Sequence, residues 1–246
     1  MNALSTELFG IPLSLLDFPR VKSWRGLGSS DSNQYADRLA TVFDYRNTFY
    51  DRQPRLDWSD PPEESSAYDF VLSSDVFEHV APPLDKAFRN VYDMLKSNGV
   101  LVFTVPYEIE DSAEHFPDLH EYGMAEVGER HVLVNRTRGG ETQIFENLNF
   151  HLSGSGESLE MRVYSEKTLR DSLAAAGFSS VKIHAGNYQP FGIVTAESWS
   201  LPISARKGPF ACNIDAMRDV MEEWRDLRAR VARSKWIRMG RRLGLF

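Results

Sequence analysis

The spacing of apolar and polar residues predicts alternating strands and helices in the middle of the chain. Residues 68–74 form a short apolar run that ends at a polar Ser-Ser-Asp, as a buried strand does. After two prolines, apolar residues recur at helical spacing from Leu84 to Leu95, and Asn98-Gly99 supplies a left-handed helix stop. Residues 100–105 are again continuously apolar. Strand, helix and strand of this kind predict a parallel βαβ unit.

The predicted alternation of strands and helices continues in both directions along the chain. The further predicted elements are a helix after residue 31, a strand at 45–50, a shorter strand that ends at 56–57, a helix that Ser165 begins and Gly177 ends, and strands at 178–183 and 199–203. Together these elements predict an α/β fold with a shortened Rossmann-like, doubly wound and mostly parallel sheet.

Two segments depart from this alternation of strands and helices, and they define the expected domain boundaries. Runs at 131–136 and 142–145 flank Arg-Gly-Gly, a hairpin signal, and 159–163 adds another alternating strand. We interpret 108–164 as an inserted β flap over the carboxyl edge of the sheet. Apolar residues from Ile214 to Val231 fall on one helical stripe. The predicted organisation is therefore a Rossmann-like domain at 1–211 and a basic helical extension at 212–246.

Composition and charge narrow the classes of function. The chain has 246 residues, 42% of them hydrophobic, which suits one main domain, and its single cysteine, Cys212, excludes an internal disulfide and any cysteine-based zinc cluster. A cytoplasmic protein is the expectation. The net charge of -7 is uneven, because residues 225–246 carry eight basic side chains against one acid, so the remainder carries -14. An acidic body disfavours nucleic-acid binding.

The carboxy-terminal segment at 212–246, which combines an apolar helical face with many basic residues, has two interpretations. The simpler one is a helix packed on its own domain or on a second subunit, as in a homodimer. The second is weak contact with an anionic membrane surface.

The segment Tyr68-Asp-Phe-Val-Leu-Ser-Ser-Asp-Val-Phe-Glu-His-Val80, with the following helix and the turn Leu95-Lys-Ser-Asn-Gly99, resembles the central segment of class I S-adenosylmethionine-dependent methyltransferases. The resemblance is strongest over 68–106. It implies that S-adenosylmethionine binds at the carboxyl ends of the parallel strands. The short core and the flap are similar to small methyltransferase-like proteins of bacterial polysaccharide pathways.

This resemblance implies a set of cofactor-binding residues: Gly26, Gly28, Asp51, Asp57, Ser73, Ser74, Asp75 and Glu78. The first loop keeps two of the family's three glycines and lacks its acidic lead-in. Asp51 is the nearest counterpart of the ribose-binding acid. Asp57 resembles the acid that contacts the adenine amine, and the alternative is a cap or turn residue. For Glu78 the alternative is an acid favoured in the first turn of a helix.

Three histidines are candidates for catalysis, because removal of a hydroxyl proton suits a group with a pKa near neutrality: His79, His115 and His120. The alternative for each is a hydrogen-bonded structural histidine. A metal site built from Glu114, His115, His120 and His151 is a competing use of these groups. The five-residue step between His115 and His120 crosses a proline and matches no metal motif, so the sequence predicts no metal.

The preferred acceptor is a hydroxyl of a sugar, glycan or other small molecule. The Asn-Pro-Pro-Tyr-like motif of base-methylating and glutamine-methylating enzymes does not follow the strand at 68–74. A degenerate, non-catalytic methyltransferase fold that acts as a binding protein is the alternative. A nicotinamide-dependent sugar oxidoreductase is third, because Gly-x-Gly-x-x-Gly and a Tyr-x-x-x-Lys pair near the sheet edge are absent.

Overall fold

The computed structural model describes residues 1–108, 112–128, 130–153, 156–189, 192, 194, 198–211, 214–234 and 239. Cys212 and residues 235–238 and 240–246 of the basic tail, for which predictions were made, lie outside these residues.

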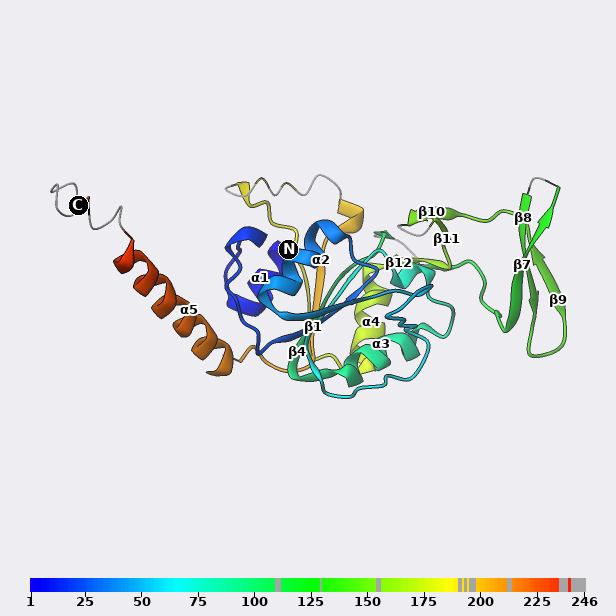
Figure 1. The fold of residues 1–246 in the computed structure, drawn as a ribbon. Coiled ribbons are helices and arrows are strands. Elements are labelled where there is room, and N and C mark those ends of the chain that lie inside the picture. The colour runs from blue at the N-terminus through cyan, green and yellow to red at the C-terminus, as the bar shows by residue number, and fades with distance from the viewer. Residues whose placement is uncertain are drawn as a thin grey trace.

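A six-stranded sheet forms the centre of the protein, in the order β13-β14-β4-β3-β1-β2 (Figure 1). Its strands are β1 (Arg25–Ser29), β2 (Asp44–Thr48), β3 (Tyr68–Ser74), β4 (Leu95–Thr104), β13 (Ser180–Ile183) and β14 (Ile203–Arg206). The strands β2, β1, β3 and β4 are parallel, and β14 runs antiparallel to both of its neighbours. The predicted mostly parallel α/β fold is therefore confirmed.

Helices cover both faces of this sheet, which explains why its central strands are continuously apolar. On β4, Val100 and Val102 pack in the core shared with α1 (Asn2–Phe9) and α2 (Asn33–Val42). The alternate residues Leu101 and Phe103 pack in the core shared with α3 (Leu84–Met94) and α4 (Glu166–Ala176). The predicted ends of α4 are confirmed: Ser165 accepts a hydrogen bond from the backbone of Thr168, and Gly177 is left-handed with φ 107°.

Three predicted boundaries are wrong. Helix α3 ends at an extended Leu95 rather than at Gly99, because Leu95 is buried and pairs with Tyr68 as the first residue of β4. The last strand of the sheet lies at 203–206, and the segment predicted for it begins with the short 3-10 turn η4 (Ser198–Ser200). The short strand predicted to end at 56–57 is reduced to an isolated parallel bridge between Phe49 and Arg55.

The described residues of the insert form three small sheets. Its strands are β5 (Tyr107–Glu108), β6 (Ala113–Glu114), β7 (Glu121–Val127), β8 (Arg130–Arg136), β9 (Thr142–Phe145), β10 (Phe150–Ser153), β11 (Gly156–Leu159) and β12 (Arg162–Ser165). The predicted hairpin is confirmed as the antiparallel pair β8–β9, which β7 extends. Figure 1 shows the β7–β8–β9 sheet standing away from the domain, whereas β10, β11 and β12 lie beside it.

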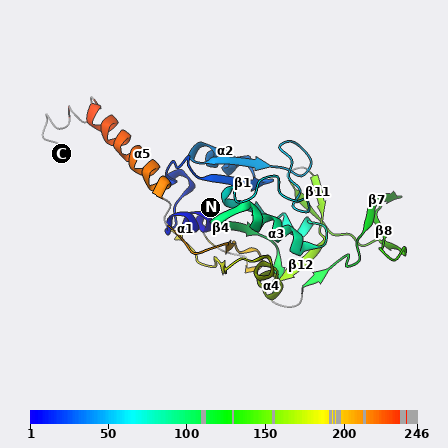
Figure 2. The ribbon, with the colours of Figure 1, turned by 90° about the horizontal axis from the view of Figure 1, so that it is seen from below.

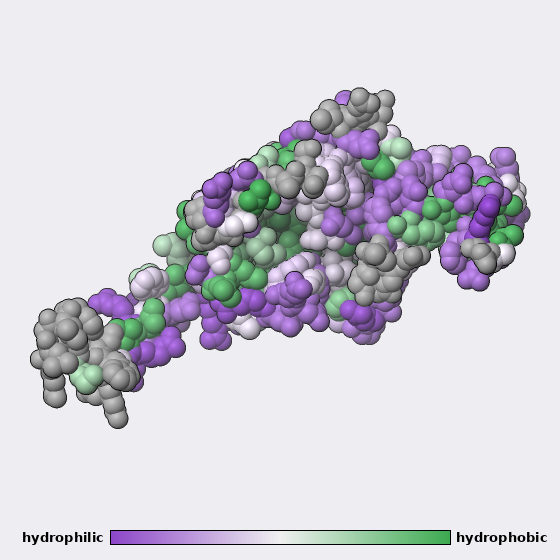
Figure 3. Space-filling model, turned by 90° about the horizontal axis from the view of Figure 1, so that it is seen from above, coloured by the Kyte–Doolittle hydropathy of each residue, from purple (hydrophilic) through white to green (hydrophobic). Residues whose placement is uncertain are grey.

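Helix α5 (Ile214–Arg233) meets the domain near its beginning and then projects outward (Figures 1 and 2). Asp219 and Glu223 accept hydrogen bonds from the backbones of Ser23 and Arg20. Apolar side chains along the helix are exposed beside charged ones (Figure 3): Met217, Met221, Trp224, Leu227 and Val231. Within the described residues, none of the helices combines the length and the apolar character that crossing a bilayer requires.

Candidate active site

The carboxyl ends of β1, β2, β3 and β4 form one rim, because the strands are in parallel register. Ser29 pairs with Thr48 of β2 and with Ser73 of β3, so three hydroxyl side chains lie in one row across the rim. All three are buried. Thr48 donates to the backbone carbonyl of Gly28 at 2.6 Å, and Ser29 accepts from the indole of Trp58 at 3.0 Å. The Ser73 hydroxyl has no hydrogen-bond partner among the described residues.

The two predicted glycines of β1 are required by packing within the protein. A Cβ on Gly26 would lie 2.2 Å from the ring of Phe70, and one on Gly28 would lie 2.0 Å from the Tyr45 hydroxyl and 2.4 Å from the Asp31 carboxylate. Larger residues are therefore excluded at both positions. At Gly28 the space beside the backbone is filled by the protein's own tyrosine and aspartate.

Asp31 holds this part of the rim together. Its carboxylate accepts hydrogen bonds from the hydroxyls of Tyr35, at 2.8 Å, and Tyr45. The backbone N–H of Asp31 donates to the side chain of Asn47, which in turn donates to the Asp31 carbonyl. Burial raises the pKa of Asp31 to about 6, although both tyrosine hydrogen bonds act to lower it. Sequence reasoning chose none of Tyr35, Tyr45 and Asn47, since each is unremarkable in its own segment.

Ser30 occupies the position of the missing third glycine. It has a positive φ of 58°, a left-handed conformation that non-glycine residues adopt at a cost. Asp75, directly after β3, also has a positive φ, 51°. The turns after β1 and β3 are thus shaped alike, and each is tied to a neighbouring strand end: Ser30 to the carbonyl of Thr48 and Asp75 to that of Thr104.

The structure places the two acids predicted after the next strands near the surface. Asp51 is exposed in a bend beyond β2. One Asp57 oxygen accepts from the backbone of Ser59 at 2.9 Å, and the other lies 3.4 Å from the guanidinium of Arg55. This geometry is that of a turn residue, the alternative raised for Asp57.

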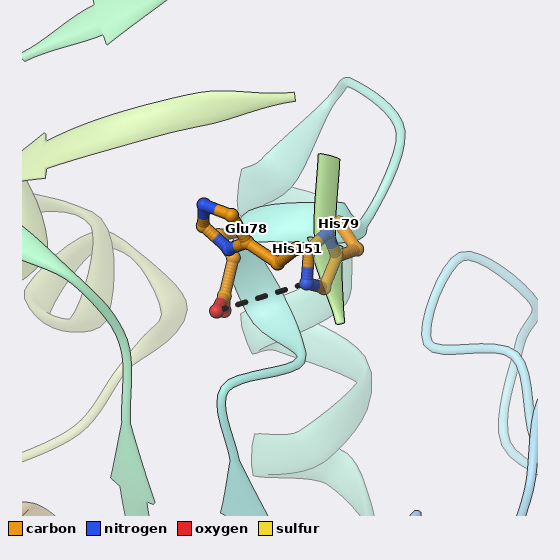
Figure 4. A group of neighbouring side chains, drawn as sticks. All are labelled: Glu78, His79 and His151. Atoms are coloured by element: carbon orange, nitrogen blue, oxygen red, sulfur yellow. Dashed lines mark ion pairs between the residues drawn. The ribbon is translucent and has the colours of Figure 1, made fainter. Parts of the chain in front are cut away.

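A cluster of ionisable side chains lies at the carboxyl end of β3, where the insert returns to the sheet. Glu78 and His79 lie on the 3-10 turn η2 (Phe77–His79), and His151 comes from β10 (Figure 4). Glu160 joins the histidines of the insert: one oxygen lies 2.8 Å from Nε2 of His115, and the other lies 2.8 Å from Nε2 of His151.

Buried polar contacts fix the turn that carries Glu78 and His79. Arg162, 2% exposed, donates to the backbone carbonyls of Phe77 and Val80 and pairs with Glu114 at 2.5 Å. The Glu78 carbonyl accepts from the backbone N–H of Met161. Nδ1 of His79 lies 2.8 Å from a backbone carbonyl oxygen of the insert, which fixes this nitrogen as the donor and leaves Nε2 with its lone pair.

The environment of η2 favours the neutral forms of both side chains. Burial, together with smaller contributions from the charges of Asp75 and Glu160, raises the pKa of Glu78 to about 8, although the charge of Arg162 acts to lower it. Burial also lowers the pKa of His79. Neither oxygen of the Glu78 carboxylate has a hydrogen-bond partner in the part of the chain that the structure describes. Groups whose pKa is shifted in this way gather at functional sites.

The methyltransferase domain profile matches residues 28–183, which include the rim, η2 and the insert. The chain belongs to the methyltransferase domain family. It is a class I methyltransferase, and S-adenosylmethionine is its cofactor. The similarity to the central segment of such enzymes is thereby confirmed. No match was found among curated protein sequences.

Solved structures similar to this methyltransferase include several S-adenosylmethionine-dependent methyltransferases. One from Clostridium acetobutylicum has 13% identity and a TM-score of 0.44, with 75% of this chain and 84% of the other covered. A putative one from Listeria monocytogenes has 16% identity and a TM-score of 0.46, with 78% and 93% covered. The sugar N-methyltransferase KedS8 from Streptoalloteichus has 15% identity and a TM-score of 0.43, with 76% and 81% covered. These likenesses carry no argument about the acceptor.

The rim of the methyltransferase fits a cofactor at the end of β3 better than at the end of β1. At β3, the Ser73 hydroxyl is buried without a described partner, and the neighbouring Ser74 and Asp75 are exposed. A bound ligand that offers hydrogen-bonding groups would satisfy Ser73. At β1, Tyr45 and Asp31 cover Gly28. Ser73, Ser74 and Asp75 are therefore the residues best placed to hold the cofactor.

The three predicted catalytic histidines separate into two groups. His79 and His115 belong to the cluster, joined through His151 and Glu160. His120 lies at the base of the β7–β9 sheet, where its backbone N–H donates to the side chain of Asn135. Sequence reasoning missed Glu160 and Arg162. The predicted strand at 159–163 alternates charged and apolar residues, but in the structure Glu160 lies between β11 and β12, Arg162 begins β12, and both side chains are buried.

A cavity of about 320 Å³ opens beside the cluster, within the insert of the methyltransferase. It is lined by His115, Phe116, Ile144, Phe145, Glu146, Asn147 and Asn149. Aromatic rings, two amides and a carboxylate thus surround a space next to a histidine that Glu160 orients.

Proposed function

We propose that this methyltransferase transfers a methyl group to a hydroxyl of a sugar or glycan. The observation that carries the proposal is the pairing of His115 with Glu160 at a cavity lined by aromatic and amide side chains. The apolar face of a sugar ring packs on aromatic side chains such as Phe116 and Phe145. Its hydroxyls find donors and acceptors in Asn147 and Asn149.

His115 is the base in this proposal. With Nε2–H donated to Glu160, its Nδ1 keeps a lone pair that takes up the acceptor's proton as the new oxygen–carbon bond forms. Glu160 orients the ring and stabilises the positive charge that His115 gains. Bound S-adenosylmethionine supplies the methyl group from a positively charged sulfur. The larger part of the acceleration comes from holding donor and acceptor in line.

In the proposed function, one part of the chain binds the methyl donor and another part binds the acceptor. The sheet rim, through Ser73, Ser74 and Asp75, holds the donor. The insert at 108–164, which supplies every residue of the cavity, holds the acceptor. The similarity to proteins of bacterial polysaccharide pathways supports a carbohydrate acceptor as well.

Incubation with a methyl-labelled donor and a panel of nucleotide sugars, monosaccharides and oligosaccharides tests the proposal. Mass spectrometry should detect an O-methylated product. His115→Asn should lower kcat by about 100-fold or more, because a general base contributes on that order. His131→Asn is the matched control, since the His131 side chain on β8 is about half exposed and lies outside both the cluster and the residues that line the cavity. Methylation of amino sugars alone, or full activity in His115→Asn, would contradict the proposal.

A further inference from the structure

Three side chains that come from separate elements converge beside the β3 rim. Glu78 and His79 come from η2 and His151 from β10, and one ligand-type atom of each lies within 4.8 Å of the others. Nε2 of His79 is 3.8 Å from Oε1 of Glu78, which is too long for a hydrogen bond. Two ligands of one ion, each about 2.0 to 2.2 Å from it, lie roughly 3 to 4 Å apart. The three atoms are therefore spaced to share an ion after a small inward movement (Figure 4).

The hydrogen bonds of the two histidines leave the correct nitrogens for such an ion. Nδ1 of His79 donates to the carbonyl of Leu159, so Nε2 is left as the ligand. Nε2 of His151 is held by Glu160, so Nδ1 is left. Metal-binding histidines commonly donate their second ring N–H to a backbone carbonyl or a carboxylate, and one histidine here does each.

The charge of the surroundings also suits a cation. Glu78 is fully buried, and its two oxygens have no partner among the described residues. Asp75 and Glu160 add negative charge near Glu78, against the single positive charge of Arg162, which is itself paired with Glu114. A buried carboxylate without a partner is costly, and a bound cation removes that cost.

We propose that Glu78, His79 and His151 bind a divalent transition-metal ion, for which Zn²⁺ is the natural probe. Two imidazoles and one carboxylate form a ligand set that Zn²⁺ and neighbouring metals accept, and they leave a coordination position open. A sequence pattern could not reveal this site, because His151 lies far along the chain from Glu78. The role of the open coordination position rests on the proposed function, in which it binds an oxygen of the acceptor. Glu160 contacts both His151 and His115 and so links the ion to His115.

Metal binding is measured on the full chain without an affinity tag, after dialysis against a chelator. Calorimetry with Zn²⁺ should show a single ion per chain, and Co²⁺ should give visible absorption bands of a nitrogen- and oxygen-coordinated ion. Glu78→Gln and His151→Gln should each weaken binding by more than Glu160→Gln, for which about 10-fold to 100-fold is expected. His131→Gln should bind as the wild type does. Far-ultraviolet circular dichroism establishes that each variant is folded.

The outcomes separate this proposal from the proposed function. Absence of Zn²⁺ heat and of Co²⁺ bands in folded wild type, or equal affinity in His151→Gln and His131→Gln, would overturn the metal site even if sugars are methylated. A site that binds Zn²⁺ in a protein that methylates no carbohydrate would retain the metal site and overturn the acceptor class.

Discussion

Asp31 and Glu78 are two buried carboxylates at the same rim of the sheet, and their surroundings differ. Asp31, beside β1 and β2, accepts hydrogen bonds from two tyrosine hydroxyls. Glu78, after β3, has no such partner within the described part of the chain. Burial raises the pKa of both, to about 6 for Asp31 and to about 8 for Glu78. Hydrogen bonds to the charged form of Asp31 lower its pKa, whereas the charges of Asp75 and Glu160 add to the effect of burial on the pKa of Glu78.

This difference in hydrogen-bond partners separates the rim into a half that serves the fold, at β1 and β2, and a half that serves function, at β3. At β1 and β2, polar groups are satisfied by their neighbours and Gly28 is covered, so folding alone explains the residues there. At β3, the Ser73 hydroxyl and the Glu78 carboxylate are buried and unsatisfied among the described residues. Evolution retains such costs where a ligand offsets them, which is why we locate cofactor and metal binding at this half.

The largest expected effect is that of Glu78→Gln on stability in chelator-containing buffer. The ordinary pKa of glutamate is 4.5, so the folded protein binds the Glu78 proton more tightly than the unfolded chain does. Wild-type stability therefore falls as pH rises from about 4.5 to about 8, by up to about 5 kcal/mol, and is flat with respect to this group above pH 8. Glutamine does not titrate, so the variant lacks this decline.

Urea unfolding of both proteins at several pH values measures the difference. Parallel stability curves for wild type and Glu78→Gln between pH 5 and pH 8 would show that Glu78 is charged and satisfied in the folded protein. The contrast with Asp31 would then be lost.

A smaller effect of the same sign is expected for Asp31→Asn. The pKa of Asp31 rises from its ordinary value of 3.8 to about 6 on folding. Its contribution to stability therefore declines as pH rises from about 4 to about 6, by about 3 kcal/mol, relative to the asparagine variant. Equilibrium unfolding in urea over this range measures the effect, with Glu78→Gln as the comparison. A decline that extends to pH 8 would mean that the two tyrosines do not favour the charged form.

Sequence patterns were sufficient for the βαβ unit at 68–104 because its strands are buried on both faces and show continuous apolar runs, and its helix buries one apolar stripe. The ends of elements were less predictable. Leu95 belongs to β4 because it pairs with Tyr68. Nothing in the local sequence indicates that the helix ends there rather than at the apparent stop signal, Gly99. Likewise, β14 is placed at 203–206 by pairing with β4, which lies about a hundred residues earlier.

Only part of the site could be predicted, because contacts between segments that are distant in the chain leave no local sequence signal. Ser73 to His79 were found from one continuous segment. The links from Glu160 to His115 and His151 depend on the packing of the insert against η2, which the periodicity of 159–163 did not reveal. Both charged side chains of this segment are buried, because Arg162 donates to backbone carbonyls of the turn and Glu160 pairs with the two histidines.

The smallest expected effects come from two hydroxyls in the same row of the rim. Thr48→Val removes a buried hydrogen bond to the Gly28 carbonyl and should cost about 1 kcal/mol of unfolding free energy. Ser73→Ala removes a hydroxyl without a described partner, so it should leave stability unchanged within about 0.5 kcal/mol or raise it slightly. Calorimetric titration with S-adenosylmethionine should give the opposite order, with affinity lowered in Ser73→Ala and kept in Thr48→Val. Equal losses of affinity in the two variants would mean that the cofactor spans the whole rim, and the division between its halves would fail.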